Sequence, residues 1–332
     1  MPLPHRQRST KRRGAGVLRR PRYLRYVRAA EVPLERTIRI LLQTTTPGGP
    51  DDWSIDSLTL LREHLASLRD GDTRFAVTAR NRESGADGDD PVLASLDRSR
   101  FDELWLFALD GGDGMSAGDC RGIDRFRRRG GGILATRDHQ DMGSSLCNLG
   151  GIGAAHYFHS RNPEPEPDRQ VADDVGTPSI SWPNYHSGRN GDFQKIIPLA
   201  PEHELLRNAG PAGSIELFPA HPHEGAVGPP PADHSARVVA QGTSLTTGRR
   251  FNLIVAFDRS PRPDGKLLGR GVAESSFHHF ADYNWDTGRG APSFVTESPG
   301  RGMQTEPRAL ADIKRYVRNL AVWLAPLNAE GP

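Results

Sequence analysis

The sequence contains only two cysteines, Cys120 and Cys147, among its 332 residues. Two thiols are too few for a disulfide framework or a cysteine-based zinc site, which indicates a reducing compartment. The sequence also has no run of about 18 apolar residues, so no transmembrane helix and no membrane partner are expected. These absences together predict a cytoplasmic protein.

Motifs of several large enzyme classes are missing. There is no GxSxG elbow, no Walker loop and no GxGxxG after a predicted strand, which argues against a serine hydrolase, a P-loop enzyme and a dinucleotide-binding protein. The positions of the thiols argue against a cysteine nucleophile. Cys120 falls on the apolar face of a predicted helix, and Cys147 lies several residues beyond the strand end where a nucleophile would be needed.

The net charge of +2 conceals a basic N-terminal arm. Residues 1–36 carry eleven lysines and arginines and two acids, a surplus of nine, which leaves the remainder of the chain at −7. A solvated, disordered arm, or a start codon placed too far upstream, explains this composition better than a binding function. Because phosphate contacts dominate the affinity for nucleic acid, the acidic body argues against a nucleic-acid partner, except through the arm.

Short apolar runs alternate with helical patterns over the first 140 residues. Four runs read as strands, at 37–43, 74–78, 103–109 and 133–136. The third run is apolar on both faces, as a strand inside a covered parallel sheet should be. Alternating strands and helices with short connections predict an α/β fold with a doubly wound, mostly parallel sheet.

Two helices are expected between these strands. The first has apolar residues at three- and four-residue spacing from Ile55 to Leu68, with Asp51 or Asp52 as its cap. The second begins with capping-box spacing at Ser116 and ends at Gly130. Shorter helical stretches are expected near 92–96 and at 144–149.

The second half of the chain is less regular. Residues 161–200 read as an irregular insertion within a single domain at 37–326, and a loop of this length is commonly functional or disordered. Four more strands that could extend the same sheet are expected at 214–218, 236–241, 251–257 and 271–277. The last helix is expected through 310–324, with Thr305 as a cap and a position near the first strand.

The stretch at 130–143 organises the predicted site. Three glycines end a helix, the apolar run 133–136 forms a strand, and Asp138 and His139 then enter a loop that closes at Gly143. In an open α/β sheet, ligands bind in the crevice beyond the carboxyl ends of the strands. We therefore expect the site to be centred on this loop.

Further polar clusters follow other predicted strands or lie in long loops, and eight histidines fall between positions 139 and 234. We expect substrate-binding groups from the insertion and from the segment after the last strand: Tyr185, His186, Arg189, Asn190 and Asp282. We expect Asp138, His139 and Glu224 to carry the chemistry.

His221 and His223 have a spacing that suits a metal ion. In an extended segment, residues two apart point the same way, so these rings could bind one ion with His139 and with His278 or His279. Adjacent histidines face opposite sides, so only one of the last two should reach the site, and His279 is chosen as the third ligand. Zinc, manganese or iron would suit such a mixed site. No HExxH motif is present, so a metal-free alternative, in which Asp138 or Glu224 acts as acid or base and His139 relays a proton, stays open.

The stretch from Gly130 to His139 resembles the corresponding element of ThuA-like (trehalose-utilisation) domains, which have the class I glutamine amidotransferase-like fold. The apolar strand before it and the later strand that leads to His278 and His279 match in order. The resemblance covers roughly 37–160 and, more loosely, 214–325. It implies a flavodoxin-like three-layer sandwich, a role in sugar metabolism, His139 at the elbow position and no glutaminase cysteine.

These observations favour an enzyme of hydrolase or lyase type, not a glutaminase, that acts on a carbohydrate or a related polyhydroxylated small molecule. The alternative is a non-catalytic module that binds a small molecule or serves as a scaffold on the same fold. The substrate, the presence of a metal and the formation of a homo-oligomer are left open by the sequence.

Overall fold

The central element of the protein is a nine-stranded sheet with the order β2-β3-β1-β4-β5-β13-β12-β11-β8, in a computed structural model that describes residues 36–208 and 213–327. Its middle strands are parallel: β3 (Thr73–Arg80), β1 (Arg36–Thr44), β4 (Glu103–Phe107), β5 (Gly132–Thr136) and β13 (Gly271–Glu274). The outer strands are antiparallel: β2 (Arg69–Asp70) at one edge, and β12 (Arg250–Phe257), β11 (Ala236–Thr243) and β8 (Ile197–Pro198) at the other. The predicted α/β class is confirmed. The predicted arm at 1–36 lies, except for Arg36, outside the described residues.

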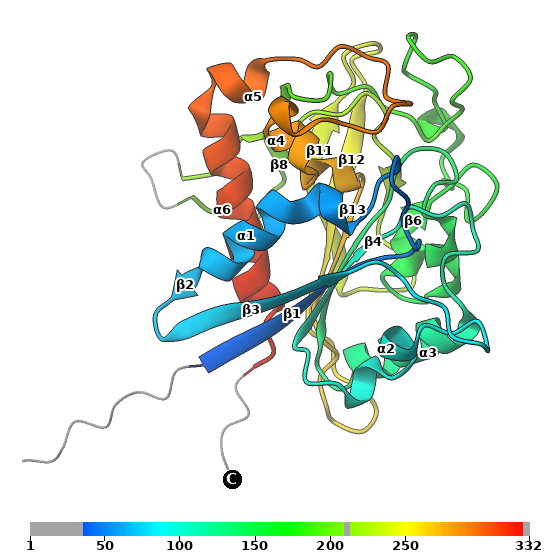
Figure 1. Ribbon diagram of the computed structural model, residues 1–332, viewed down its shortest axis with the longest axis vertical. Coiled ribbons are helices and arrows are strands. Elements are labelled where there is room, and N and C mark those ends of the chain that lie inside the picture. The colour runs from blue at the N-terminus through cyan, green and yellow to red at the C-terminus, as the bar shows by residue number, and fades with distance from the viewer. Residues whose placement is uncertain (1–35, 209–212, 328–332) are drawn as a thin grey trace, which may run out of the picture. The chain divides into compact units, whose positions relative to one another are not determined.

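Both faces of the sheet are covered, which gives three layers. Along β4, Trp105 and Phe107 enter one apolar core, and Leu104 and Leu106 enter another, because successive side chains of a strand point to opposite faces. Helices α1 (Thr59–Ser67) and α6 (Pro307–Leu324) contribute to the first core, and α2 (Pro91–Ala94) and α3 (Ala117–Arg128) to the second (Figure 1). Burial on both faces explains why the central strands are almost wholly apolar.

The first residues of the helices show which of the predicted N-caps are correct. Ser116 accepts a hydrogen bond from the backbone N–H of Asp119 and completes the predicted capping box of α3. The predicted cap at Asp51 or Asp52 is wrong, because Ser54 caps the 3₁₀ turn η1 (Ile55–Leu58) that leads into α1. Thr305 is also wrong as the cap of the last helix. It ends the short α5 (Gly302–Thr305), and the Glu306 side chain caps α6.

Three of the four later strands join the main sheet as expected. The strand expected at 214–218 does not: β9 (Leu217–Pro219) pairs with β7 (Phe193–Lys195) in a separate ribbon, since β8 already occupies the free edge of β11. A second small ribbon joins β6 (His156–Tyr157) to β10 (Ala226–Val227). The strand expected at 271–277 ends at Glu274, and its last residue belongs to the 3₁₀ turn η7 (Phe277–His279), which leads to α4 (Asp282–Trp285).

Most of the remaining turns are short 3₁₀ segments. These are η2 (Leu96–Arg98), η3 (Ser144–Asn148), η4 (Gly153–Ala155), η5 (Pro167–Arg169), η6 (Glu204–Leu206) and η8 (Thr287–Arg289). The irregular segment between η5 and β7 contacts the loop after β5, where the Gln140 N–H donates to the Pro183 carbonyl at 3.0 Å. The insertion therefore lies over the carboxyl end of β5.

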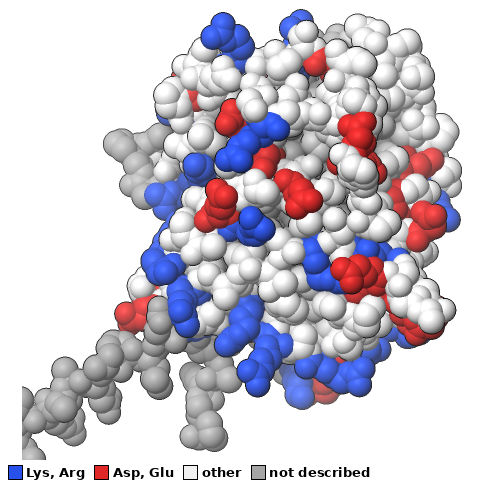
Figure 2. Space-filling view, in the orientation of Figure 1, with Lys and Arg blue, Asp and Glu red and all other residues white. Residues whose placement is uncertain are grey.

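Acidic and basic side chains are interspersed on the face of the molecule that Figure 2 shows. Among the described residues drawn there, basic side chains outnumber acidic ones along the lower edge of the view. Within the same described residues, none of the helices is both long enough and apolar enough to cross a bilayer.

Candidate active site

The loop after β5 is held by a buried arginine. Arg137 follows the strand directly, is fully buried, and donates to the carbonyls of Gln140 at 2.7 Å and Ala226 at 3.4 Å. Its guanidinium also lies 4.0 Å from the ring centre of Phe158. Gln140 adopts a left-handed φ of 48°, which turns the chain sharply after His139. The loop is therefore a rigid platform for Asp138 and His139.

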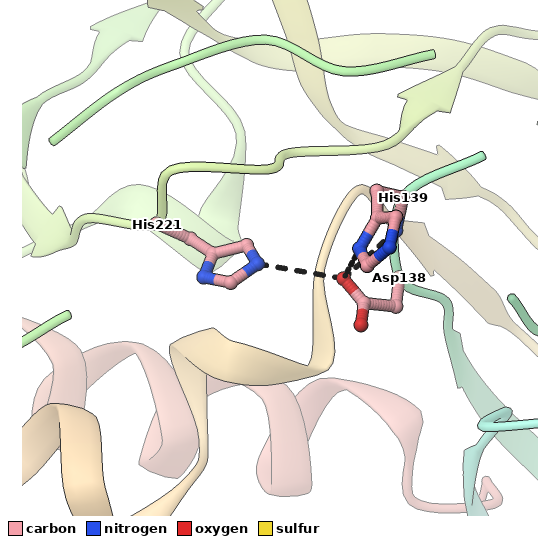
Figure 3. Close-up of side chains that lie close together, drawn as sticks. All are labelled: Asp138, His139 and His221. Carbon is pink, nitrogen blue, oxygen red and sulfur yellow. Dashed lines mark hydrogen bonds and ion pairs between the residues drawn. The ribbon is translucent and has the colours of Figure 1, made fainter. Parts of the chain in front are cut away.

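Asp138 is the centre of the site. Its side chain is 5% exposed, and its Oδ1 atom accepts hydrogen bonds from the backbone N–H of His139 at 2.8 Å and from His139 Nδ1 at 3.1 Å. His221 Nε2 lies 3.4 Å from the same oxygen (Figure 3), and His278 Nε2 lies 3.7 Å from Oδ2. Burial alone would raise the pKa of this carboxyl, but the histidines, His139 above all, hold it well below its usual value.

His278 reaches Asp138 because β5 and β13 are adjacent parallel strands. Thr136, at the end of β5, pairs with Glu274, at the end of β13. The residues that follow the two strands therefore meet at one edge of the sheet.

His139 is positioned as a proton carrier. Burial would lower the pKa of its ring, but the Asp138 carboxylate outweighs burial and raises it. The hydrogen bond to Asp138 fixes Nδ1 as the protonated nitrogen, so Nε2 is the atom free to exchange a proton with a ligand. The ring lies 5.2 Å, centre to centre, from that of His223.

The tautomer of His221 is fixed by a chain of hydrogen bonds that begins at a backbone carbonyl. Asn284 Nδ2 donates to the Ala220 carbonyl and to Asn190 Oδ1, both at 3.0 Å, so Asn190 Oδ1 is an acceptor. His221 Nδ1, 3.0 Å from that oxygen, must then be the donor. Burial and the neighbouring His278 push the pKa of His221 well below its usual value, so the ring is neutral and Nε2 carries a lone pair. This Nε2 atom has no hydrogen-bond partner among the described residues.

These groups line a cavity of about 400 Å³. The polar residues that line it include Asp52, Asp138, His139, Asn190, His221, His223, His278 and Glu297. The apolar residues that line it include Trp53, Met142, Ile180, Phe294 and Val295. None of the described lining residues is a lysine or an arginine. The cavity therefore combines hydrogen-bonding groups and acids with an aromatic surface.

Two groups of side chains have the spacing of metal ligands. Asp138, His139 and His221 form one, and Asp174, His223 and Glu297 form the other; in each, one ligand atom per residue lies within 4.8 Å of the others. Zinc, manganese or iron would suit either mixture of imidazole and carboxylate. Burial, followed by the nearby His139, lowers the pKa of His223 to about 4, so this imidazole is available as a neutral ligand.

Five predicted site residues meet at the cavity: Asp138, His139, Asn190, His221 and His223. Glu224 and His279 do not line it. His279 is fully buried, with Nε2 3.1 Å from Glu224 and Nδ1 3.0 Å from Glu274. Burial alone would lower the pKa of His279, but the two glutamates raise it to about 10. The structure thus places His278, and not the predicted His279, at the cavity; both lie on the 3₁₀ turn η7 and not on the extended segment that the prediction assumed.

The other predicted substrate-binding residues lie outside the cavity lining. Tyr185 is buried and stacks on Phe251 with ring centres 4.8 Å apart, and His186 Nδ1 contacts the Pro222 carbonyl at 3.3 Å. Arg189 is exposed. Asp282 accepts hydrogen bonds from the backbone N–H groups of Thr59 and Leu60 and so caps the start of α1.

Sequence reasoning missed several residues that line or support the cavity: Trp53, Asp174, Asn284, Phe294 and Glu297. Asn284 lies on the short helix α4. The others lie in loops without periodicity, and no spacing links them in the sequence. Only the fold brings them together.

No protein-family model matches the chain, and a comparison with curated proteins finds no match. Solved structures with a similar fold include a protein described as ThuA-like from Parabacteroides merdae ATCC 43184, with 14% identity, a TM-score of 0.43, and coverage of 90% of this chain and 94% of that one. They also include the glutaminase domain of Trypanosoma brucei CTPS with bound acivicin, with 12% identity, a TM-score of 0.41, and coverage of 88% and 98%. The structural neighbours thus include a ThuA-like protein and a glutaminase domain, the two kinds of protein that the resemblance names.

Proposed function

We propose that this protein is an enzyme that acts on a neutral, polyhydroxylated small molecule such as a carbohydrate, by acid–base chemistry of the hydrolase or lyase type. The observation that carries the proposal is the arrangement of His139 and His221 around the buried Asp138 carboxylate, on the wall of a cavity of about 400 Å³. A cavity of this volume suits a small-molecule ligand.

The two histidines suit opposite roles. His139 donates a hydrogen bond from Nδ1–H to Asp138. The carboxylate therefore stabilises the doubly protonated ring, which can give its Nε2 proton to a leaving group. His221 is held with Nδ1–H toward Asn190, and its buried Nε2 lone pair faces Asp138 Oδ1 at 3.4 Å. Nε2 can therefore accept a proton from a substrate hydroxyl when the bound substrate separates the two groups. Environments that push the proton affinities of two groups apart are typical of paired acids and bases.

The charge of the cavity supports a neutral substrate. Asp52, Asp138 and Glu297 line it, and none of the described lining residues is a lysine or an arginine to bind a phosphate or a carboxylate. Trp53 and Phe294 also line the cavity and provide apolar surface, against which the C–H face of a sugar ring can pack.

The chemistry of the thiols argues against a glutaminase. Asp138 and His139 occupy the turn after β5, and burial raises the pKa of Cys120 to about 11. Burial also raises the pKa of Cys147, and neither cysteine lines the cavity. A thiolate nucleophile is therefore unavailable at this site.

A panel of sugars and sugar lactones tests the proposal. A ligand that binds the folded state raises its thermal stability, and each ligand found in this way is then assayed for turnover. We expect His139→Ala and His221→Ala to lower turnover by about 10²- to 10⁴-fold. His159→Ala, which removes an exposed histidine outside the cavity lining, is the matched control.

Turnover that survives both site substitutions would overturn the proposed chemistry. A ligand that binds wild-type protein in the cavity but is never converted would instead support the alternative, a non-catalytic small-molecule-binding module.

A further inference from the structure

We propose that Asp174, His223 and Glu297 bind a divalent transition-metal ion beside the acid–base pair. The inference deepens the proposed function, because the ion would sit in the same cavity. Asp174 comes from the insertion, His223 from the segment between β9 and β10, and Glu297 from the loop before α5. One ligand atom from each lies within 4.8 Å of the other two.

Two of the candidate ligand atoms have no hydrogen-bond partner among the described residues, whereas Glu297 Oε1 accepts one hydrogen bond, from Thr177 Oγ1 at 3.3 Å. Asp174 is 8% exposed, and its Oδ2 atom has no hydrogen-bond partner within the part of the chain that the structure describes. The same holds for His223 Nδ1, although the two atoms lie only 3.0 Å apart. Buried polar atoms are almost always paired, so two unpaired atoms that face each other require an explanation.

A carboxylate lies near each nitrogen of His223: Asp174 Oδ2 is 3.0 Å from Nδ1, and Glu297 Oε1 is 3.7 Å from Nε2. An imidazole between two carboxylates offers a nitrogen and an oxygen donor to one cation, which would be attracted to both acids.

His279 shows what a histidine held by two carboxylates looks like when a proton is the link. Its two nitrogens form hydrogen bonds to Glu224 at 3.1 Å and to Glu274 at 3.0 Å. His223 has the same kind of neighbours but aligns with neither as a hydrogen bond. His279 therefore forms hydrogen bonds to both of its carboxylate neighbours, whereas His223 forms none to either of its own.

The charge around the group points to a cation. Asp52, Asp138 and Glu297 line the cavity and Asp174 lies against His223, and none of the described lining residues is a lysine or an arginine. Asp174 is buried, and a buried carboxylate is costly unless a cation compensates it. A divalent ion would supply that compensation.

The other ligand-like group, at Asp138, shares one of these features, since His221 Nε2 has no hydrogen-bond partner among the described residues and lies 3.4 Å from Asp138 Oδ1. That oxygen, however, accepts two hydrogen bonds, from the backbone N–H and from Nδ1 of His139, and these donors occupy its two lone pairs. Asp174 Oδ2 has no such donor among the described residues, so we assign the ion to the group at Asp174.

One imidazole and two carboxylates form a mixed ligand set that suits zinc, manganese or iron and leaves coordination positions for water or substrate. An ion at this place could hold substrate hydroxyls and polarise one of them next to His139. Because Asp174 is the only ligand from the insertion, ion binding would also tie the insertion to the cavity wall.

Calorimetric titration of the metal-free full-length protein with ZnCl₂ and with MnCl₂ tests the site without reference to activity. We expect one ion per chain, and an affinity more than about tenfold weaker in Asp174→Asn and in Glu297→Gln. Glu166→Gln is the matched control, since it removes an exposed carboxylate of the same insertion. Glu297 is partly exposed, so its substitution tests the site even where Asp174→Asn fails to fold.

Asp138→Asn separates this inference from the proposed function. We expect this variant to lose turnover but to bind the ion as wild type does. Loss of ion binding in Asp138→Asn, with binding intact in Asp174→Asn and Glu297→Gln, would move the ion to the other group and overturn the assignment. Absence of binding of either ion to wild-type protein would also overturn it, and would leave the acid–base proposal standing.

Discussion

The ring of His221 stacks on that of His278, with ring centres 3.6 Å apart and planes that differ by 13°. Trp53 also packs against His278 in a T-shaped arrangement, with ring centres 4.9 Å apart and planes that differ by 87°. The position of His221 is therefore fixed by packing, and its orientation by the hydrogen bond to Asn190. Both constraints keep Nε2 directed at Asp138.

The first prediction concerns the tautomer of His221. Nitrogen NMR of the histidine rings at neutral pH should show a neutral His221 with the proton on Nδ1. Asn190→Leu removes the acceptor that fixes this tautomer, so the signal should shift toward the Nε2-protonated form. The ring nitrogens of His156, a buried histidine that is not in contact with Asn190, provide the control. A wild-type His221 with its proton on Nε2 would contradict the proposed base.

The second prediction concerns Glu103, which is fully buried on the central strand β4 and accepts a hydrogen bond from Trp105 Nε1 at 2.9 Å. Burial raises the pKa of its carboxyl well above the usual 4.5. The folded state therefore keeps a proton that the unfolded chain loses above about pH 4.5, so this group costs stability increasingly as pH rises through that range. Glu103→Gln should be more stable than wild type by about 1–3 kcal/mol at pH 8.5.

Urea unfolding of both proteins at pH 5.5 and pH 8.5 checks this prediction. Other titrating groups contribute equally to the variant and to wild type. The difference in the free energy of unfolding between the two proteins should therefore increase with pH. Glu63→Gln, at an exposed position of α1, should show no such growth. An equal difference at both pH values would mean that Glu103 is charged in the folded protein.

The elements around β5 could be predicted from sequence because their signals are local. The glycines before Ile133, the apolar run and the polar loop at Asp138 define a helix end, a strand and a strand-end loop without any knowledge of the rest of the chain. The different positions of His278 and His279 could not be predicted in this way, because the strand ends at Glu274 and both residues lie on the turn η7. Which of the two faces the cavity depends on the turn at Ser276, whose side chain accepts from the His278 N–H.

The members of the site that lie in loops could not be predicted in this way. Glu224 and His279 look like catalytic groups in the sequence, but they form a buried ion-pair network with Glu274 that only the tertiary structure reveals. Asp174 and Glu297 are 123 positions apart in the chain and approach each other only across His223. No periodicity encodes such a contact.

The third prediction follows from the observed position of Asp282. Its carboxylate accepts hydrogen bonds from the Thr59 N–H at 3.1 Å and the Leu60 N–H at 2.8 Å, at the start of α1. Asp282→Ala leaves these donors unpaired and should destabilise the protein by about 0.5–2 kcal/mol. Asp282→Asn keeps one of the two acceptor oxygens and places an amide N–H beside the other donor, so it should recover only part of that loss. Urea unfolding measures both, and equal losses in the two variants would argue against a capping role.

The fourth prediction reverses the usual effect of replacing a helical glycine. Alanine normally stabilises a helix interior by roughly 0.5–1 kcal/mol relative to glycine. A Cβ atom at Gly122, in the middle of α3, would however lie 2.1 Å from the Leu93 carbonyl oxygen of α2, which is backbone and cannot rotate away. Gly122→Ala should therefore destabilise the protein by about 1–3 kcal/mol, because the two helices must separate. Gly111→Ala, where nothing lies within 4 Å of the added atom, is the control. A Gly122→Ala protein as stable as wild type in urea would show that α2 and α3 do not pack as closely as described.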